Sequence, residues 1–474
     1  MLITSANFFI FLTFVFAVFY IIRARWQSIW LLSVSYIFII LWNWQFAVVL
    51  LAITIFHYTY GYLLSRNKRK FLLALGIGAN VLLLLYFRSI NFLLPETIVF
   101  FSRLGVNFQS GAIYFLLPIG LSYHVLQNIS YLVDVYRGQI PPANNFIHFA
   151  LYLAYFPKLL AGPIERARTF LPKLTAERTI TNQDFSKSVF LIIGGLVRKL
   201  VLADSVLAAI PDQIFQNPAP YSPIDLIGWL IVYAFVIYND FAGYTSVARG
   251  VSLLFGIDLS INFDHPYFAR NFSEFWNRWH ITLSHWLRDY IYFPLSRALL
   301  KVLPNRQNLI NLIIPPLVTM LVSGLWHGIG FHMIVWGALH GMYQVVERLL
   351  VSGKPLVSPD QQPIWRQLLS NGVVFFLVLM AWVPFRMEMP IAIIYWKTML
   401  NFSNLSIQSG RLLLILAYIG FWMLIDWLLY RQRNEFFWLR FPKFAQAGLL
   451  AAFFLLVLIA SATETSTPFI YQGF

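Results

Sequence analysis

Long apolar runs separated by short polar segments dominate the chain. A helix that crosses a hydrocarbon layer of about 30 Å needs about 20 apolar residues. The runs that meet or approach this length predict an all-α polytopic membrane protein with about 11 to 13 transmembrane or embedded helices, within one membrane domain over 1–474. They lie at 4–22, 28–45, 47–63, 71–86, 112–133, 146–163, 187–206, 223–240, 308–326, 331–349, 369–385, 411–429 and 445–461.

Three polar stretches interrupt this pattern. The stretch 165–178 (ERARTFLPKLTAER) is basic and contains proline, which predicts a cytoplasmic loop or a helix at the lipid headgroups. In 262–297, arginines alternate with Phe, Trp and Tyr. The stretch 352–366 (SGKPLVSPDQQPIWR) is rich in Pro, Ser and Gly, and we expect it to link two halves of the bundle.

Basic residues near the first helices predict the orientation of the chain. The first apolar run has no Lys or Arg before it and no small-residue cleavage site after it, so we expect a retained helix. Arg23 and Arg25 follow this run, and a second basic cluster at 66–70 follows the predicted hairpin of 28–45 and 47–63. Because Lys and Arg are enriched in cytoplasmic loops, the N-terminus is predicted to be extracytoplasmic.

Composition supports this assignment and narrows the chemistry. Only 11% of the 474 residues are charged, whereas soluble proteins carry about 25%, and the mean hydropathy is +0.68. The 34 Lys and Arg outnumber the 19 Asp and Glu, giving a net charge of +15. In a membrane protein this surplus indicates cytoplasmic loops rather than nucleic-acid binding. There is no cysteine, which excludes disulfides, thiolate metal sites and a cysteine nucleophile.

A histidine lies inside apolar sequence at 321–341, LVSGLWHGIGFHMIVWGALHG. His327 ends an apolar run in which Pro315 and Pro316 bend or break the helix. Because a polar side chain facing lipid is penalised, we expect His327 to face the interior of the bundle. Two interpretations stay open on this stretch alone: a buried histidine that only packs, or a functional one.

A second candidate lies in 271–297, NFSEFWNRWHITLSHWLRDYIYFPLSR. Read as one helix, this stretch would align Trp276, His280, Ser284 and Leu287 on one face. An interfacial helix whose aromatic residues anchor at the headgroups and whose arginines reach toward water explains part of the pattern. It does not explain a histidine on the aromatic face.

The spacing of the histidines does not favour a metal site. Zinc ligands on one helix are spaced i, i+4, but His327 to His332 and His280 to His285 are each five residues apart, and 321–341 contains no carboxylate. Nor does a serine triad fit, because Ser323 and His327 have no acidic neighbour. A histidine general base remains, which would activate a hydroxyl for direct attack on a thioester without an acyl-enzyme intermediate.

At these residues the chain resembles the membrane-bound O-acyltransferase family, and within it the alginate O-acetylase branch more than the teichoic acid D-alanylation branch. The resemblance covers most of the chain. It rests on LLPIGLSYHVLQNISYLVDVYRG (116–138), FPKLLAGPIERA (156–167), YNDFAGYTSVARG (238–250), INFDHPYFARNFSEFWNRWHITLSHWLRDYIYFPL (261–295), SGLWHGIGFHMIVWGALHG (323–341) and TETSTPFIY (463–471).

The resemblance implies a helix bundle around a tunnel in the bacterial cytoplasmic membrane, with an acyl donor arriving from the cytoplasm and an acceptor from outside. His327 matches the family's invariant histidine and would be the base or its close assistant; His280 matches a second histidine and would orient donor or acceptor. Arg270, Arg278 and Arg288 would attract the phosphates of coenzyme A. Acetyl-CoA is the implied co-substrate, an exported polysaccharide the acceptor, and a separate extracytoplasmic acetyltransferase the partner.

One motif departs from the family pattern. Where relatives commonly read Asp-Phe-Ser-Gly-Tyr-Ser-Asp, this chain has DFAGYTS at 240–246, so the second acidic residue is missing. Two other classes of function remain open. A polysaccharide or lipid-linked glycan flippase predicts an inverted repeat and no thioester dependence, and an interfacial lipid-binding scaffold leaves His327 without a task.

Overall fold

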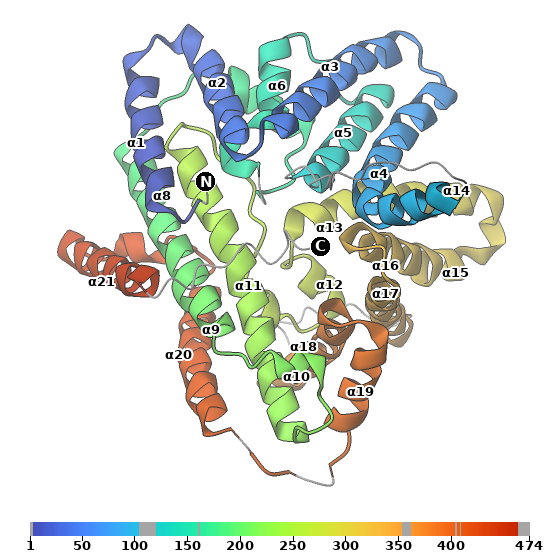
Figure 1. The fold of residues 1–474 in the computed structure, drawn as a ribbon, viewed down its shortest axis with the longest axis vertical. Coiled ribbons are helices and arrows are strands. Elements are labelled where there is room, and N and C mark those ends of the chain that lie inside the picture. The colour runs from blue at the N-terminus through green and yellow to red at the C-terminus, as the bar shows by residue number, and fades with distance from the viewer. Residues whose placement is uncertain are drawn as a thin grey trace. The chain divides into compact units, whose positions relative to one another are not determined.

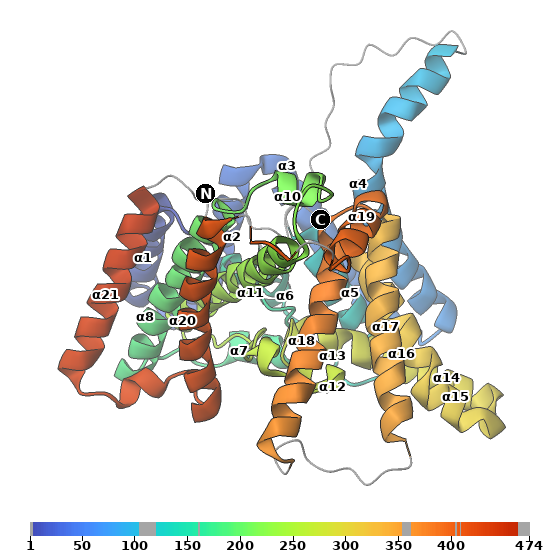
Figure 2. The same cartoon turned by 90° about the horizontal axis from the view of Figure 1, so that it is seen from below.

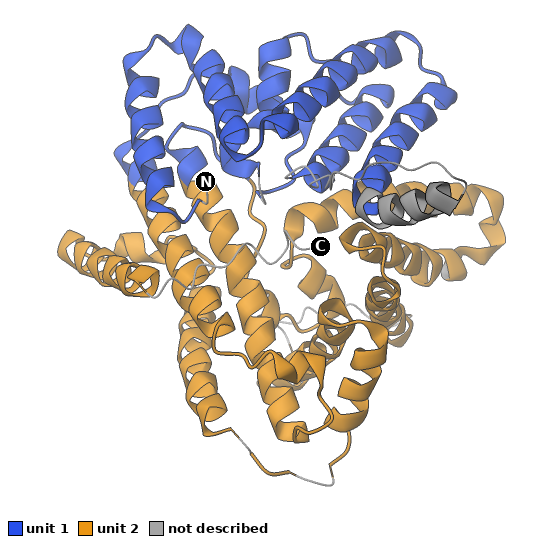
Figure 3. Cartoon of the chain, in the orientation of Figure 1, with its two compact units in different colours: residues 1–185, 251–259 blue, residues 186–250, 260–474 orange. Residues whose placement is uncertain are grey.

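The computed structural model describes residues 3–103, 120–159, 162–352, 362–402, 405–407 and 409–462, and the secondary structure within these ranges is helical (Figures 1 and 2). This confirms the predicted all-α fold. The chain divides into two compact units, residues 1–185 with 251–259 and residues 186–250 with 260–474 (Figure 3). The prediction of one membrane domain over 1–474 stays a prediction.

In the first unit, small residues and polar side chains lie at the contacts between helices. His57 Nε2 lies 2.8 Å from Asn80 Nδ2, which joins α3 to α4, and Gly61 of α3 has no room for a Cβ because the Tyr131 ring of α5 fills that space. The elements are α1 (Ala6–Ile21), α2 (Ala24–Trp42), α3 (Trp44–Arg66), α4 (Lys70–Arg103), α5 (Leu121–Tyr136), α6 (Phe146–Ala154), η1 (Phe156–Lys158) and α7 (Ala167–Thr175).

The second unit begins within α8 and contains both sequence motifs that carry histidines. Its elements are α8 (Asn182–Leu196), η2 (Val197–Asp204), α9 (Ser205–Leu207), α10 (Gln213–Gln216), α11 (Pro223–Leu253), η3 (Pro266–Phe268), α12 (Phe272–Trp276), α13 (Ile281–Leu287), η4 (Arg288–Tyr292), α14 (Phe293–Val302), η5 (Pro304–Arg306), α15 (Gln307–Leu312), α16 (Ile314–His327), α17 (Phe331–Val351), α18 (Ile364–Arg386), α19 (Met389–Met399), α20 (Gly410–Gln432), η7 (Phe437–Arg440) and α21 (Lys443–Ala462).

Within the described ranges, eight helices are long and apolar enough to cross a membrane. Most expose large apolar side chains, for example Leu414 on α20 and Ile459 on α21, as lipid contact requires. The 31-residue α11 differs, because 89% of its most apolar window is buried inside the protein. Together with the relatives reported below, these helices make the chain a multi-pass membrane protein.

Several predicted segments differ from the observed elements. The run 146–163 is not one helix, since α6 ends at Ala154 and η1 follows. The predicted break at the prolines is confirmed: α15 ends at Leu312, and Pro315 and Pro316 stand in the first turn of α16, where a missing backbone N–H costs least. The motif 463–471, residues 112–119 of one predicted helix and most of the linker 352–366 lie outside the described residues.

Glycines bring α16 and α17 into backbone contact. A Cβ on Gly324 would lie 2.3 Å from the Met333 carbonyl oxygen, and a Cβ on Gly337 would lie 2.4 Å from the Met320 carbonyl oxygen. Small residues allow this closeness between membrane helices. Figure 2 shows the two helices running side by side. His327, at the end of α16, is therefore held by the register of this pair.

Candidate functional site

His280 lies at a break between two short helices. The prediction of one continuous helix through 271–297 is wrong: α12 ends at Trp276, α13 begins at Ile281, and His280 has a left-handed φ of 42°. Asn262 holds the break, because its backbone oxygen accepts from Ile281 N–H at 2.9 Å and its Oδ1 accepts from the Thr282 hydroxyl at 2.6 Å. Trp276 and His280 therefore do not share a helix face.

His327 is the last residue of α16 and is buried at 4% exposure. Aromatic rings surround it edge to face: its ring centroid lies 4.8 Å from Trp326, 5.1 Å from Trp336 and 5.4 Å from Phe385. The predicted inward orientation is thus observed. This wall excludes water and strengthens any electrostatic interaction made inside it.

Trp326 joins the two predicted histidines. The His280 and Trp326 ring centroids lie 6.2 Å apart, and Phe241 of α11 packs on His280 at 4.7 Å. His280 lies outside the spanning helices, and burial lowers its pKa to about 3. At neutral pH its imidazole is uncharged, which is the form that accepts a proton or donates one hydrogen bond. The structure therefore brings His280 and His327 into one aromatic site.

Sequence reasoning assigned no role to His340, another buried histidine near His327. It is 1% exposed and sits on the face of α17 that also carries Trp336, Tyr343 and Glu347. Its ring lies 4.9 Å from Trp336 and 5.0 Å from Trp276 of α12. The spacing of these α17 residues, i, i+4, i+7 and i+11, was the available signal.

Glu347 fixes the start of α12. Its Oε2 accepts from Phe272 N–H and its Oε1 from Ser273 N–H, and the rings of Phe272 and Tyr343 stack at 5.0 Å. The carboxylate satisfies backbone donors that a helix leaves unpaired at its N-terminus. As a result α17 positions α12, which in turn leads into the His280 break.

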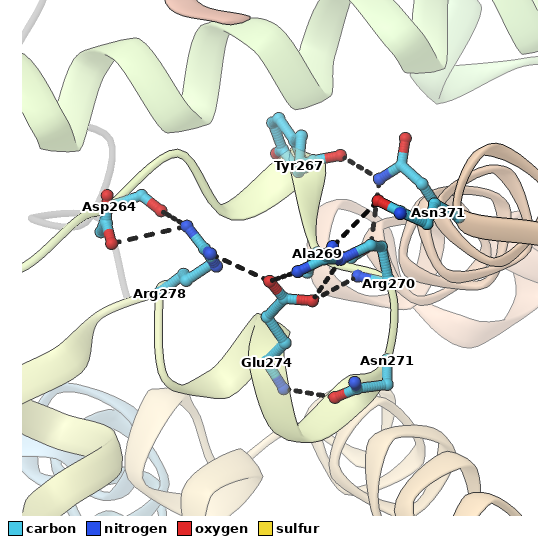
Figure 4. Close-up of polar contacts among 9 residues, drawn as sticks. Asp264, Tyr267, Ala269, Arg270, Asn271, Glu274, Arg278 and Asn371 are labelled. Carbon is cyan, nitrogen blue, oxygen red and sulfur yellow. Dashed lines mark hydrogen bonds and ion pairs between the residues drawn. The ribbon is translucent and has the colours of Figure 1, made fainter. Parts of the chain in front are cut away.

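Two of the three predicted donor-binding arginines converge on one carboxylate (Figure 4). Arg270 Nη2 lies 3.1 Å and Arg278 Nη2 lies 2.9 Å from Glu274 Oε1. Arg278 also donates to the backbone oxygen of Asp264 at 3.1 Å, and Asn371 of α18 donates to the neighbouring loop carbonyls. Asp264 Oδ2 also lies 3.4 Å from Arg278 Nη1, so two carboxylates hold the two guanidinium groups in place.

The arginine pair lines an open cavity of about 920 Å³. Arg433, Asp264 and Glu435 line it as well, and the Arg278 guanidinium lies 4.9 Å from the centroid of the Tyr430 ring. Arg288 is not among the lining residues; it lies on η4, half-exposed, with its Nε 3.2 Å from Asp289 Oδ1. The structure therefore groups Arg270 with Arg278 and places Arg288 elsewhere.

The Glu274 contacts predict an acid-sensitive stability. Burial opposes the charge of Glu274, but hydrogen bonds from Arg270 and the charges of Arg278 and Arg270 outweigh it and hold its pKa below 4.5. The stabilisation is therefore complete above pH 4.5 and is lost as the pH falls through the lowered pKa. We expect Glu274→Gln to cost about 2 kcal/mol at neutral pH.

Thermal unfolding in detergent between about pH 3 and 7 measures both effects. The wild type should lose stability toward acid, whereas Glu274→Gln should start lower and lose less. Asp289→Asn is the control, because its partner Arg288 is 46% exposed and such pairs contribute little. Equal acid sensitivity of the wild type and Glu274→Gln would contradict the prediction.

A buried ion-pair cluster on α11 and η2 was also missed. Lys199 Nζ lies 2.7 Å from Asp204 Oδ1 and 2.6 Å from Asp240 Oδ1, and all three side chains are almost fully buried. Asp240 is the first residue of the DFAGYTS motif, and the structure pairs it with Lys199. Within the described ranges, no three His, Cys, Asp or Glu side chains gather in a way that would hold a metal ion.

Comparison with known proteins agrees with this architecture. The model of the membrane-bound O-acyltransferase family matches residues 132–389. A Pseudomonas aeruginosa protein named "Probable alginate O-acetylase AlgI" is 33% identical over 87% of this chain and 80% of its own length. The "Peptidoglycan O-acetyltransferase" of Helicobacter pylori is 30% identical over 76% of this chain and 71% of its own.

The "Teichoic acid D-alanyltransferase" of Streptococcus thermophilus is 29% identical over 56% of this chain and 68% of its own. The predicted resemblance to the alginate O-acetylase branch is confirmed by the longer match to that group. Residues 132–389 contain both histidine motifs and the arginine pair. The chain is thus an acyltransferase that belongs to the membrane-bound O-acyltransferase family.

Proposed function

We propose that the chain moves an acetyl group from a cytoplasmic thioester, acetyl-CoA, across the membrane for the O-acetylation of an extracytoplasmic polysaccharide. The observation that carries this proposal is the shared aromatic site of His327 and His280, in which both imidazoles contact Trp326. A buried imidazole is the side chain suited to moving a proton near neutral pH without a metal. The two units would act as one membrane domain with an extracytoplasmic N-terminus in the bacterial cytoplasmic membrane.

In the proposed reaction, His327 accepts the proton of the acceptor hydroxyl as its oxygen attacks the thioester carbonyl carbon. The carbon–sulfur bond breaks, and the leaving thiolate takes the proton from the imidazolium, giving an ester and a free thiol. No acyl-enzyme intermediate is needed, in agreement with a chain that has no cysteine. His280, neutral at pH 7, orients the donor or acceptor across the ring of Trp326.

For the donor we propose the cavity that Arg270 and Arg278 line. A volume of about 920 Å³ is in the range of sites for nucleotide-sized ligands. Guanidinium groups form bidentate hydrogen bonds with phosphate oxygens, and Glu274 fixes the positions of both groups. Arg288, which lies apart on η4, would contribute long-range attraction to the phosphates rather than direct contact.

The names of the relatives support a polysaccharide as the acceptor. They name alginate, peptidoglycan and teichoic acid, all of them polymers outside the cytoplasmic membrane. We therefore propose an exported polysaccharide as the final acceptor and a separate extracytoplasmic acetyltransferase as the partner that completes the transfer.

Radiolabelled acetyl-CoA tests this function. Membranes that contain the chain should transfer label to exported polysaccharide, and membranes of a deletion strain should not. The deletion strain should still export the polysaccharide, but without O-acetyl groups. Polysaccharide retained inside the cell with normal acetylation would contradict the proposal and support a flippase.

A further inference from the structure

A second cavity does not include His280 or His327 among its lining residues. Its volume is about 180 Å³, whereas a single water occupies about 10–15 Å³ by a comparable measure. It is lined by residues of α8, η2, α11, α20 and α21, and it shares Ile261, Phe263 and His265 with the larger cavity. Three of these helices, α11, α20 and α21, are long enough to span a membrane.

One end of this cavity holds a charge network. Asp426 of α20 accepts hydrogen bonds from Arg198 of η2 and from the hydroxyl of Tyr238 of α11, the latter at 3.0 Å. His265 Nδ1 lies 3.0 Å from the same carboxylate. Charged groups within spanning helices are costly unless they are paired, and they mark functional sites by default.

A second ion pair lines the cavity farther along α11. Arg249 donates to both carboxylate oxygens of Glu435, at 2.7 and 2.8 Å. Tyr238 and Arg249 are eleven residues apart on one helix, so their backbone positions are separated by about 16 Å along its axis. The cavity wall therefore has a guanidinium and a carboxylate at each of two positions along α11. Within each pair the two charges cancel.

The remaining walls are partly apolar. Phe190 and Leu191 of α8, Trp422 of α20 and Phe453 of α21 contribute apolar side chains, and Asn239 and Asn262 contribute amides. The hydroxyls of Thr245 and Ser246 donate to backbone oxygens of their own helix, at 3.0 and 2.8 Å, which leaves oxygen lone pairs as acceptors. A ligand that matches these walls has a polar head with both charges and an apolar body.

We propose that this cavity binds the head group of a zwitterionic phospholipid from the bilayer. The guanidinium groups complement a phosphate and the carboxylates complement an ammonium, whereas a purely anionic head group has no positive group to place near Asp426 and Glu435. The spanning helices around the cavity make bilayer lipid the amphiphile at highest local concentration. The cavity borders the proposed donor cavity, with which it shares Glu435 and Phe436, but lipid binding here does not rest on the proposed function.

Gly194 offers a way to fill the cavity without a clash. It lines the cavity, and a Cβ built on it meets no atom within 4 Å. Gly420 of α20 is the matched control, since its Cβ also meets nothing within 4 Å, but it does not line the cavity. Gly194→Leu should occupy the space of the head group, while Gly420→Leu should leave it open.

The measurement is photo-crosslinking in nanodiscs with a phosphatidylethanolamine that carries a diazirine near its head group. We expect label on peptides of α8, α20 and α21, reduced about ten-fold in Gly194→Leu and unchanged in Gly420→Leu, the ten-fold loss corresponding to about 1.4 kcal/mol of binding free energy. In the wild type, excess unlabelled phosphatidylethanolamine should compete better than phosphatidylglycerol.

The wild-type competition needs no variant, so it decides the question even if Gly194→Leu does not fold. Equal labelling of Gly194→Leu and the wild type overturns the proposal. So does equal competition by the two lipids, or labelling confined to other helices. Because the readout is crosslinked lipid, its failure is separate from any loss of acetyl transfer.

Discussion

Replacing His327 with alanine is expected to lower the O-acetyl content of exported polysaccharide by about 100-fold or more, the usual effect of removing a general base. His327 is 4% exposed and enclosed by Trp326, Trp336 and Phe385. Water entering the space left by the imidazole has no fixed base to give its proton to, so neither water nor a neighbouring side chain restores the proton transfer. Base hydrolysis of the purified polysaccharide and measurement of released acetate quantify the loss.

His332→Ala is the matched control, because it removes an imidazole five residues away that is only partly buried. Both variants must accumulate in the membrane at the wild-type level. Full acetylation by the His327→Ala variant would remove this residue from the reaction.

Gly337→Leu is expected to destabilise the protein by about 3 kcal/mol and to abolish acetyl transfer. A Cβ at this position would lie 2.4 Å from the Met320 carbonyl oxygen and 3.2 Å from the Leu321 Cα, so the backbones of α16 and α17 must separate. The separation moves Trp336 away from His327, whose rings are now 5.1 Å apart. Thermal unfolding in detergent and acetate release measure the two effects.

Gly372→Leu on α18 makes the same change where a Cβ meets nothing within 4 Å. It should keep both stability and activity. A Gly337→Leu protein with wild-type unfolding temperature would show that the two helices tolerate separation and that their contact does not place His327.

Local sequence patterns predicted the parts of the molecule that depend on neighbouring residues. Apolar runs predicted the spanning helices, and Pro315 and Pro316 predicted the helix break before His327. The burial of His327 followed from the penalty for a polar group in lipid. The resemblance to the family predicted His280 and His327 as members of one site.

The rest depends on contacts between residues far apart in the chain. The break at His280 requires Asn262, which lies twenty residues before its partner Thr282, and a left-handed backbone that helical periodicity does not reveal. The position of the α12 N-terminus depends on Glu347, which lies 75 residues after Phe272. The partnership of Arg198 with Asp426 spans 228 residues. Hydrophobic periodicity along the sequence does not indicate which distant residues pair. The full set of site residues is therefore apparent only from the three-dimensional structure.

The close contact of α16 and α17 also bears on the order in which the site assembles. The two helices are joined only by 328–330, and contacts between sequence neighbours form before distant ones. The α16–α17 hairpin therefore positions Trp326, His327 and Trp336 early in folding. His280 reaches its position later, when the segment that contains Asn262 has folded. We infer that cells carrying a damaged 262–282 segment accumulate an inserted but inactive protein, while damage at Gly337 leads to degradation during biogenesis.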